Sequence, residues 1–89
     1  MQIYELAIIN PLGLHARACA KLVKIASRFR CTVSLVVKGR RVSARNILAV
    51  MLLGASVGST VRLETDGPDE AVAMREIAAL FQDGFGERS

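Results

Sequence analysis

Acidic residues are absent from the middle of this 89-residue chain. None occurs between Leu6 and Leu63, where ten of the 12 lysine and arginine residues fall, and all eight acidic residues lie outside that segment. The formal net charge of +4 therefore divides into +10 for the middle and −6 for the two ends. This separation of charge predicts a basic surface that faces a partner and an acidic flank beside it.

Aromatic residues are scarce. The chain has no tryptophan, one tyrosine and three phenylalanines, whereas proteins that bind single-stranded nucleic acids stack the bases on aromatic side chains. We therefore expect no nucleic-acid partner, despite the positive charge. Because 52% of the residues are hydrophobic and 22% are charged, the chain is expected to fold. Its length suits one small core, so residues 1–89 are predicted to form a single domain.

Long hydrophobic runs and cysteine clusters are also lacking. The longest apolar run, residues 47–55, is about half of what spans a bilayer, and no basic leader precedes the first apolar stretch. The only cysteines, Cys19 and Cys31, match neither a zinc site nor a disulfide framework. We expect a cytoplasmic protein with no membrane insertion, no metal and no cofactor.

The hydrophobic pattern alternates between the periods of strands and helices. It predicts strands over residues 3–9, 32–37, 40–43 and 60–66. It predicts helices over residues 16–29 and 47–53, and a third from about Pro68 to about Gln82. Lys38-Gly39 is typical of a two-residue hairpin turn, and Asn46 of a helix N-cap. This βαββαβα order predicts an α+β fold with a four-stranded, mostly antiparallel sheet covered on one side by helices.

The single histidine, His15, lies between a loop that contains Gly13 and the start of the first predicted helix. The free backbone N–H groups of a first helical turn favour an anion, and Arg17 adds a fixed positive charge with several donors. Imidazole is a capable nucleophile near neutral pH. The combination predicts a site that attacks a phosphoryl group, although a histidine before a helix is more often a surface or capping residue.

A hydrolytic or metal-dependent site is disfavoured by the same region. No acidic residue lies near His15 in the sequence to orient its ring, and a triad needs such a group. The chain also shows no cluster of residues with the spacing of metal ligands. We therefore expect phosphotransfer without a resident metal.

Residues 13–20, Gly-Leu-His-Ala-Arg-Ala-Cys-Ala, resemble the active-site motif of HPr, the histidine-containing phosphocarrier family of the bacterial phosphoenolpyruvate-dependent phosphotransferase system. The resemblance extends over nearly the whole chain. It includes the Asn10–Gly13 loop, the Lys38-Gly39 hairpin and the short helix that ends before Gly54. It implies the family's open-faced β-sandwich, in which three helices lie on one face of a four-stranded antiparallel sheet.

The resemblance also implies a function for His15. This residue would accept a phosphoryl group on Nδ1 from phosphorylated enzyme I and pass it to a histidine of an enzyme IIA component. The backbone amides of Ala16 and Arg17 and the Arg17 side chain would stabilise the phosphate. Positions that match the family's docking surface are Ala16, Ala20, Lys24, Ser27, Arg45, Ile47, Leu48 and Met51. The chain would be a monomeric phosphoryl carrier with no turnover of its own.

Two positions depart from the family's usual pattern. The family's proline after the arginine is replaced by Ala18, which constrains the first helical turn less than proline does. Many relatives have a regulatory serine where this chain has Asn46, so regulation by the family's serine kinase is not carried over. Residues 79–85 and the Asn46 region resemble the nitrogen-related paralogue, NPr, more than the sugar-transport form. Sugar uptake and nitrogen-related regulation both stay open as the output.

A second class of function is compatible with the charge pattern. Arg17, Lys21, Lys24 and Arg28 form a basic stripe along the first predicted helix, and such stripes are often simply solvated. The alternative is therefore a non-catalytic regulatory module that binds protein or nucleic acid through this face. Phosphorylation of His15 distinguishes the two functions.

Overall fold

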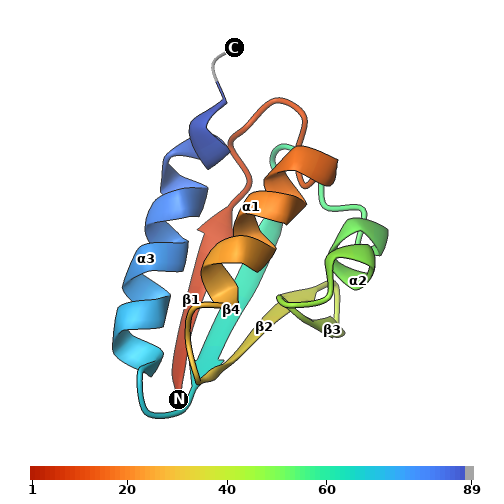
Figure 1. Ribbon diagram of the computed structural model, residues 1–89. Coiled ribbons are helices and arrows are strands. Elements are labelled where there is room, and N and C mark those ends of the chain that lie inside the picture. The colour runs from red at the N-terminus through yellow and green to blue at the C-terminus, as the bar shows by residue number, and fades with distance from the viewer. Residues whose placement is uncertain (88–89) are drawn as a thin grey trace.

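The computed structural model describes residues 1–87 and shows a sheet covered on one face by helices (Figure 1). The strands are β1 (Gln2–Ala7), β2 (Thr32–Val37), β3 (Arg40–Ser43) and β4 (Thr60–Asp66). The helices are α1 (Ala16–Ala26), α2 (Ile47–Leu52), α3 (Glu70–Gln82) and the short 3₁₀-helix η1 (Gly84–Gly86). The strands run antiparallel in the order β1-β4-β2-β3. The predicted fold class is confirmed, and η1 was not predicted.

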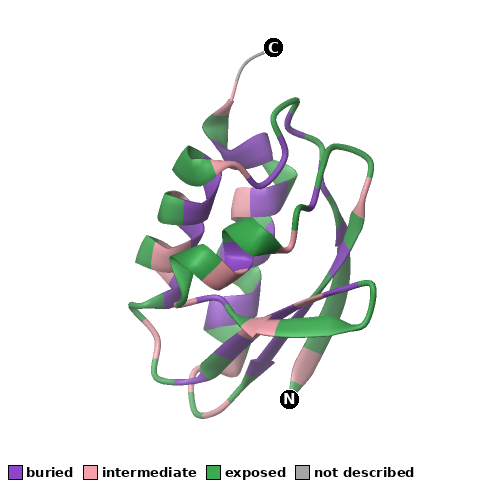
Figure 2. Cartoon of the chain, turned by 90° about the vertical axis from the view of Figure 1, so that its right-hand side faces the viewer, coloured by how far each residue is buried: buried purple, intermediate pink, exposed green. Residues whose placement is uncertain are grey.

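The strand register brings the apolar side chains of the sheet to one face. Leu6 pairs with Val61, and Leu35 pairs with Leu63; all four are buried. Helices α1 and α3 cover this face, and each has buried residues along part of its surface (Figure 2). The inward-facing side chains of the strands thus contribute to one continuous core.

The structure contains both the hairpin turn and the helix N-cap that the sequence predicts. In the hairpin between β2 and β3, Val37 pairs with Arg40, and the two turn residues Lys38 and Gly39 have φ values of 51° and 80°. Positive φ at both central positions is the geometry of a type I′ turn, which matches the twist of the strands. Asn46 caps α2, since its Oδ1 accepts a hydrogen bond from the Ala49 backbone N–H at 3.1 Å.

Helix α1 is shorter than the pattern of residues 16–29 predicts. After Ala26 the backbone N–H groups of Arg28 and Phe29 bond to carbonyls three residues earlier, at 3.0 and 3.3 Å, which tightens the last turn. The Arg45 guanidinium donates to the carbonyls of Phe29 and Cys31. These hydrogen bonds give partners to backbone groups at the end of the helix. The hydrophobic periodicity of the sequence does not reveal them.

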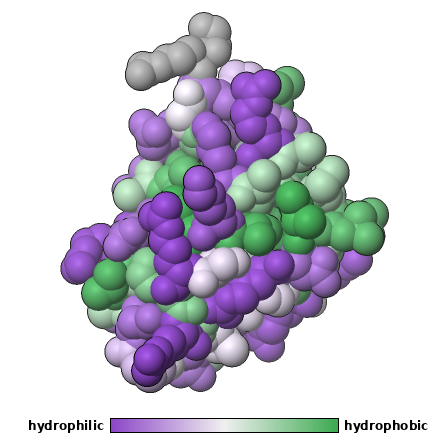
Figure 3. Space-filling model, in the orientation of Figure 1, coloured by the Kyte–Doolittle hydropathy of each residue, from purple (hydrophilic) through white to green (hydrophobic). Residues whose placement is uncertain are grey.

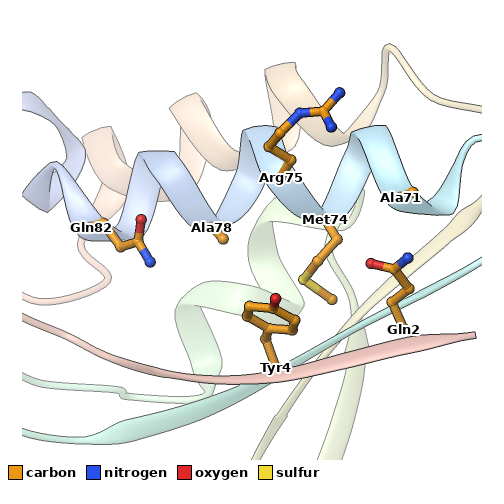
Figure 4. A pocket seen from close by; sticks show the side chains of 7 residues that line it. All are labelled: Gln2, Tyr4, Ala71, Met74, Arg75, Ala78 and Gln82. Carbon is orange, nitrogen blue, oxygen red and sulfur yellow. The ribbon is translucent and has the colours of Figure 1, made fainter.

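Two side chains on the sheet have environments that strand alternation does not explain. Glu64 lies on the uncovered face, yet is only 5% exposed, and its carboxylate lies 2.9 Å from the Arg41 guanidinium and 3.8 Å from that of Arg62. Tyr4 is on the helix-facing side of β1 but is 54% exposed. It borders a hollow between β1 and α3 that Met74 also lines (Figure 4).

The start of α3 is also displaced from the prediction. The helix begins at Glu70, so Pro68 lies before its first turn. Asp69, the N-cap residue, directs its carboxylate away from the helix and accepts hydrogen bonds from the backbone N–H groups of Arg30 and Cys31 at 2.8 and 2.9 Å. These bonds, that from Arg30 above all, hold the pKa of Asp69 below its ordinary value of 3.8. The carboxylate therefore joins α3 to the start of β2.

Replacing Asp69 with asparagine should lower the urea midpoint of unfolding at neutral pH. Because the folded state has the lower pKa, the stability contributed by the carboxylate is fully present above 3.8 and is lost as the pH falls through the folded value. The difference in urea midpoint between wild type and Asp69→Asn should therefore become smaller at acidic pH. Asp83→Asn, an exposed change after α3, is the control. If the difference in urea midpoint were the same at every pH, the ionised Asp69 carboxylate would not be the source of the stabilisation.

Candidate functional site

The loop that leads into α1 is fixed against the segment after α2. The Leu14 backbone N–H donates to the Ala55 carbonyl at 2.9 Å, and that of Gly13 to the Asn10 carbonyl at 3.1 Å. The buried Asn10 side chain donates to the Gly13 carbonyl at 2.7 Å. Gly13 has a φ of +66°, and a Cβ there would lie 2.7 Å from the Ala55 carbonyl oxygen. Only glycine fits this position without displacement.

His15 is the N-cap residue of α1, with extended backbone angles. Its carbonyl accepts the first helical hydrogen bond, from the Cys19 N–H at 2.9 Å. The N–H groups of Ala16 and Arg17 therefore have no partner within the helix. The His15 side chain is 25% exposed, and Arg17 is exposed on the same turn. The predicted nucleophile, the two amides and the cation thus lie within three consecutive residues.

An acidic side chain that sequence reasoning missed contacts the histidine. The Oε2 atom of Glu87 forms a hydrogen-bonded pair with His15 Nε2, and the same oxygen accepts a bond from Asn10 Nδ2 at 3.1 Å. The expectation that no acid orients the ring rested on proximity in the sequence and is wrong. The two residues are 72 positions apart, and no local motif signals that the segment after α3 returns to this loop.

The contact depends on the anchored residues of η1, which precede Glu87. Phe85 is 1% exposed and packs edge-on against Phe81, with ring centroids 4.8 Å apart. Lys21 Nζ donates to the Phe85 carbonyl at 2.6 Å. The hydrogen bond from His15, followed by that from Asn10, lowers the pKa of Glu87 below its ordinary value. Glu87 therefore presents an ionised carboxylate to the ring at neutral pH.

Most of the predicted docking residues form one exposed surface. Helices α1 and α2 pack together, and Ala16, Ala20, Lys24 and Ser27 are exposed on α1. On α2, the exposed apolar side chains are Ile47, Leu48, Met51 and Leu52. We call these four residues the α2 patch; Figure 3 shows hydrophobic surface at the position of this helix. It is apolar surface of the kind that marks an interaction site.

Two basic residues of the predicted surface are already engaged within the fold. Arg45 is half-buried, and its guanidinium bonds to the carbonyls that follow α1. Lys21, from the basic stripe, bonds to the Phe85 carbonyl. Arg17, Lys24 and Arg28 are the exposed members of that stripe. Part of the positive charge thus stabilises the segment after α1 and the η1 turn instead of facing a partner.

Residues 1–87 include two cysteines as further candidates for reactive side chains. Cys19 and Cys31 are free and buried, and burial raises the pKa of both thiols, which disfavours the reactive thiolate. Within this range no group of three His, Cys, Asp or Glu side chains could hold a metal ion. Nor is any helix in the described part of the chain long and apolar enough to cross a bilayer.

Comparison with known proteins gives a consistent result. Residues 4–83 match the protein family described as "PTS HPr component phosphorylation site". The chain is 53% identical over 83 residues to the phosphocarrier protein HPr of Cupriavidus necator, covering 93% of each chain. It is 49% identical over 84 residues to the phosphocarrier protein HPr of Xylella fastidiosa, covering 94% of each.

A solved structure agrees with these relatives. The fold superposes on the crystal structure of HPr-C-His from Thermoanaerobacter tengcongensis with a TM-score of 0.96, at 35% identity and with 100% of both chains covered. Sequence and fold therefore point to the same family along the full length of the chain.

Proposed function

Because the chain belongs to the HPr family and is a phosphocarrier of the phosphotransferase system, we propose that His15 carries the phosphoryl group on Nδ1. The Nδ1 lone pair attacks phosphorus, and the bond between phosphorus and the donor breaks with its electron pair leaving on the donor. In the onward step, an acceptor nitrogen attacks phosphorus, and the N–P bond of His15 breaks with its electron pair returning to Nδ1.

The position of His15 at the start of α1 is the observation that supports this proposal. The free N–H groups of Ala16 and Arg17 are donors at the positive end of the helix dipole. The exposed Arg17 guanidinium adds a permanent charge for phosphate oxygens. These groups are in place before the phosphate arrives, so little reorganisation accompanies the transfer. Ala18, buried in the same turn, leaves the helix start intact without proline.

The family implies partners within the phosphotransferase system, and we assign them roles. Phosphorylated enzyme I is the proposed donor, and a histidine of an enzyme IIA component is the proposed acceptor. The α2 patch and the exposed face of α1 would dock both in turn, since both partners must reach the same histidine. An apolar centre with basic residues beside it suits fast, transient association with acidic partners. The chain acts as a monomer in this scheme.

Incubation with phosphoenolpyruvate and enzyme I tests the proposal. Wild type should gain one acid-labile, base-stable phosphoryl group per chain, and His15→Ala should gain none, because the nucleophile is gone. Mass spectrometry of the intact chain measures the adduct. Arg40→Ala, an exposed change at the start of β3, controls for general effects of substitution and should be phosphorylated like wild type.

The same assay decides between the two classes of function. Equal behaviour of wild type and His15→Ala would exclude His15 as the carrier and favour the regulatory module that binds through the basic face. If the adduct forms, transfer to a sugar-type and to a nitrogen-type IIA protein, measured in parallel, assigns the output. Serine-kinase regulation is not expected in either case, because the N-cap of α2 is Asn46 and has no hydroxyl group.

A further inference from the structure

The two edges of the sheet differ in how they are protected against a further strand. One edge is β3, which has four residues and begins with the exposed pair Arg40 and Arg41. The other edge is β1, which has six residues and no basic residue among them. Short strands and basic side chains are among the features that prevent another chain from pairing with a sheet edge. Since β1 has neither, it is the edge that can accept a further strand.

The backbone of β1 directs hydrogen-bonding groups to this free edge. The Ile8 backbone N–H, just after β1, donates to the Ser59 carbonyl at 2.9 Å, so Ile8 bonds toward β4. In an antiparallel pair, alternate residues of a strand bond to the same partner strand. Ile3, Glu5 and Ala7 therefore direct their N–H and C=O groups away from β4. All three residues are exposed, so these groups are accessible to another backbone.

The hollow between β1 and α3 gives the side chains of a further strand a place to pack. It has a volume of about 410 Å³. In Figure 4, Tyr4 of β1 and Met74 of α3 point toward each other in it, whereas the Arg75 guanidinium points away. The small side chains of Ala71 and Ala78 line it on the side of α3. The part of the hollow next to Tyr4 is therefore apolar, and it suits aliphatic side chains.

The charge of this edge indicates which segment it can bind. Glu5 is the one charged residue of β1, and its side chain lies on the uncovered face of the sheet, because its neighbours Tyr4 and Leu6 lie on the helix-facing side. A strand added beside β1 would place one of its own side chains next to Glu5. Opposite charges stabilise such a cross-strand pair, and like charges destabilise it. The edge therefore favours a basic residue at that position.

We propose that the free edge of β1 binds an extended segment of another protein in which apolar residues alternate with basic ones. The segment adds to the sheet as a fifth strand, and its backbone pairs with Ile3, Glu5 and Ala7. Because successive side chains of a strand point to opposite faces, the apolar ones enter the hollow beside Tyr4 and a basic one lies next to Glu5.

This binding edge is separate from the surface proposed to dock the phosphotransfer partners. Figure 1 shows α2 at one side of the molecule and α3 at the other, and β1 lies beside α3. The α2 patch and the free edge of β1 can therefore be occupied at the same time. A protein bound at β1 would hold the chain while its phosphorylation state changes. The inference does not require that His15 be the phosphoryl carrier.

Hydrogen exchange of the full chain, followed by NMR, tests the inference. The probe is a short peptide with blocked ends in which valine alternates with lysine. At saturation it should slow exchange of the Ile3, Glu5 and Ala7 N–H groups by about 10-fold or more, because these donors gain partners. The N–H groups of Tyr4 and Leu6, which bond to β4, are the internal control and should change little.

Two results of this experiment would overturn the inference. One is unchanged exchange of the outward N–H groups at every soluble concentration of the peptide. The other is protection of the same groups without peptide that increases with protein concentration, because the edge would then bind a second copy of this chain instead of a basic segment.

Two variants test the charge and the backbone pairing separately, with circular dichroism to verify that each is folded. At low ionic strength, Glu5→Lys should bind the valine–lysine peptide about 3- to 5-fold more weakly and should prefer a valine–glutamate peptide. Ala7→Pro removes an outward N–H group without removing a bond to β4. It should bind about 10-fold more weakly than Ala7→Val, the matched control that keeps this donor. If Glu5→Lys does not change the preference between the peptides, or if Ala7→Pro binds like Ala7→Val, the inference is overturned.

Discussion

Replacement of Gly13 by alanine should lower the free energy of unfolding by about 2–4 kcal/mol, the combined cost of a left-handed backbone and a steric clash. A Cβ at this position would lie 2.7 Å from the Ala55 carbonyl oxygen and 2.9 Å from Ser56 Cα. Both are backbone atoms, which cannot rotate away. The loop must then separate from the segment after α2, where the Leu14 N–H bonds to Ala55. Urea unfolding followed by circular dichroism measures the change.

Gly54 offers a matched control for this prediction. Its φ of +65° is nearly that of Gly13, but no atom lies within 4 Å of the place where a Cβ would be. Gly54→Ala should therefore show only the backbone cost, about 1 kcal/mol. The difference between the two variants isolates the clash. If both variants lost the same free energy of unfolding, the loop before α1 would be able to move without cost and would not hold His15 in place.

The Gly13 variant should also be a poorer phosphocarrier. His15 follows two residues later, and displacement of the loop moves the ring relative to the amides of Ala16 and Arg17. A misplacement of about 1 Å costs on the order of 100-fold in rate when a reaction depends on orientation. We expect Gly54→Ala to be phosphorylated much faster than Gly13→Ala under conditions in which both are folded.

Truncation of Phe85 to alanine is expected to have the largest effect on stability, a loss of about 3–5 kcal/mol, as for other buried phenylalanines. The ring is 1% exposed and packs edge-on against Phe81. Its removal leaves a cavity at the end of α3, where the helix meets η1. Val72→Ala, a half-exposed apolar change on α3, is the control and should lie within about 1 kcal/mol of wild type.

Phe85 also connects stability to the site. Since this ring anchors the residues before Glu87, Phe85→Ala should weaken the contact between Glu87 and His15 Nε2. In the folded fraction of Phe85→Ala, the proton between His15 Nε2 and Glu87 should then exchange with solvent faster than in wild type. A Phe85→Leu variant keeps more apolar volume than alanine does. It should recover part of the free energy of unfolding and part of the contact between Glu87 and His15. Retention of the protected Nε2–H signal in folded Phe85→Ala would show that η1 holds Glu87 without this ring.

The local features of this protein are determined by the sequence itself. Alternation over residues 60–66 predicts β4, and the Lys38-Gly39 pair predicts a hairpin turn that the structure contains. Asparagine at position 46 predicts the N-cap of α2, which the structure contains. These features depend on dihedral preferences and hydrogen bonds within a few residues, so the local residue types are sufficient. The prediction of His15 next to free helical amides is of the same kind.

Only the tertiary structure decided what surrounds that histidine. The separation of +10 from −6 along the chain indicated a basic surface with an acidic flank and placed no acidic side chain at His15. Folding instead brings Glu87 onto His15 and buries Glu64 beneath Arg41, while Arg45 is drawn to the end of α1. Such contacts join residues distant in sequence, and their geometry is set by how the helices pack on the sheet. Periodicity has no information about that packing, so the carboxylate beside the nucleophile was visible only in the folded chain.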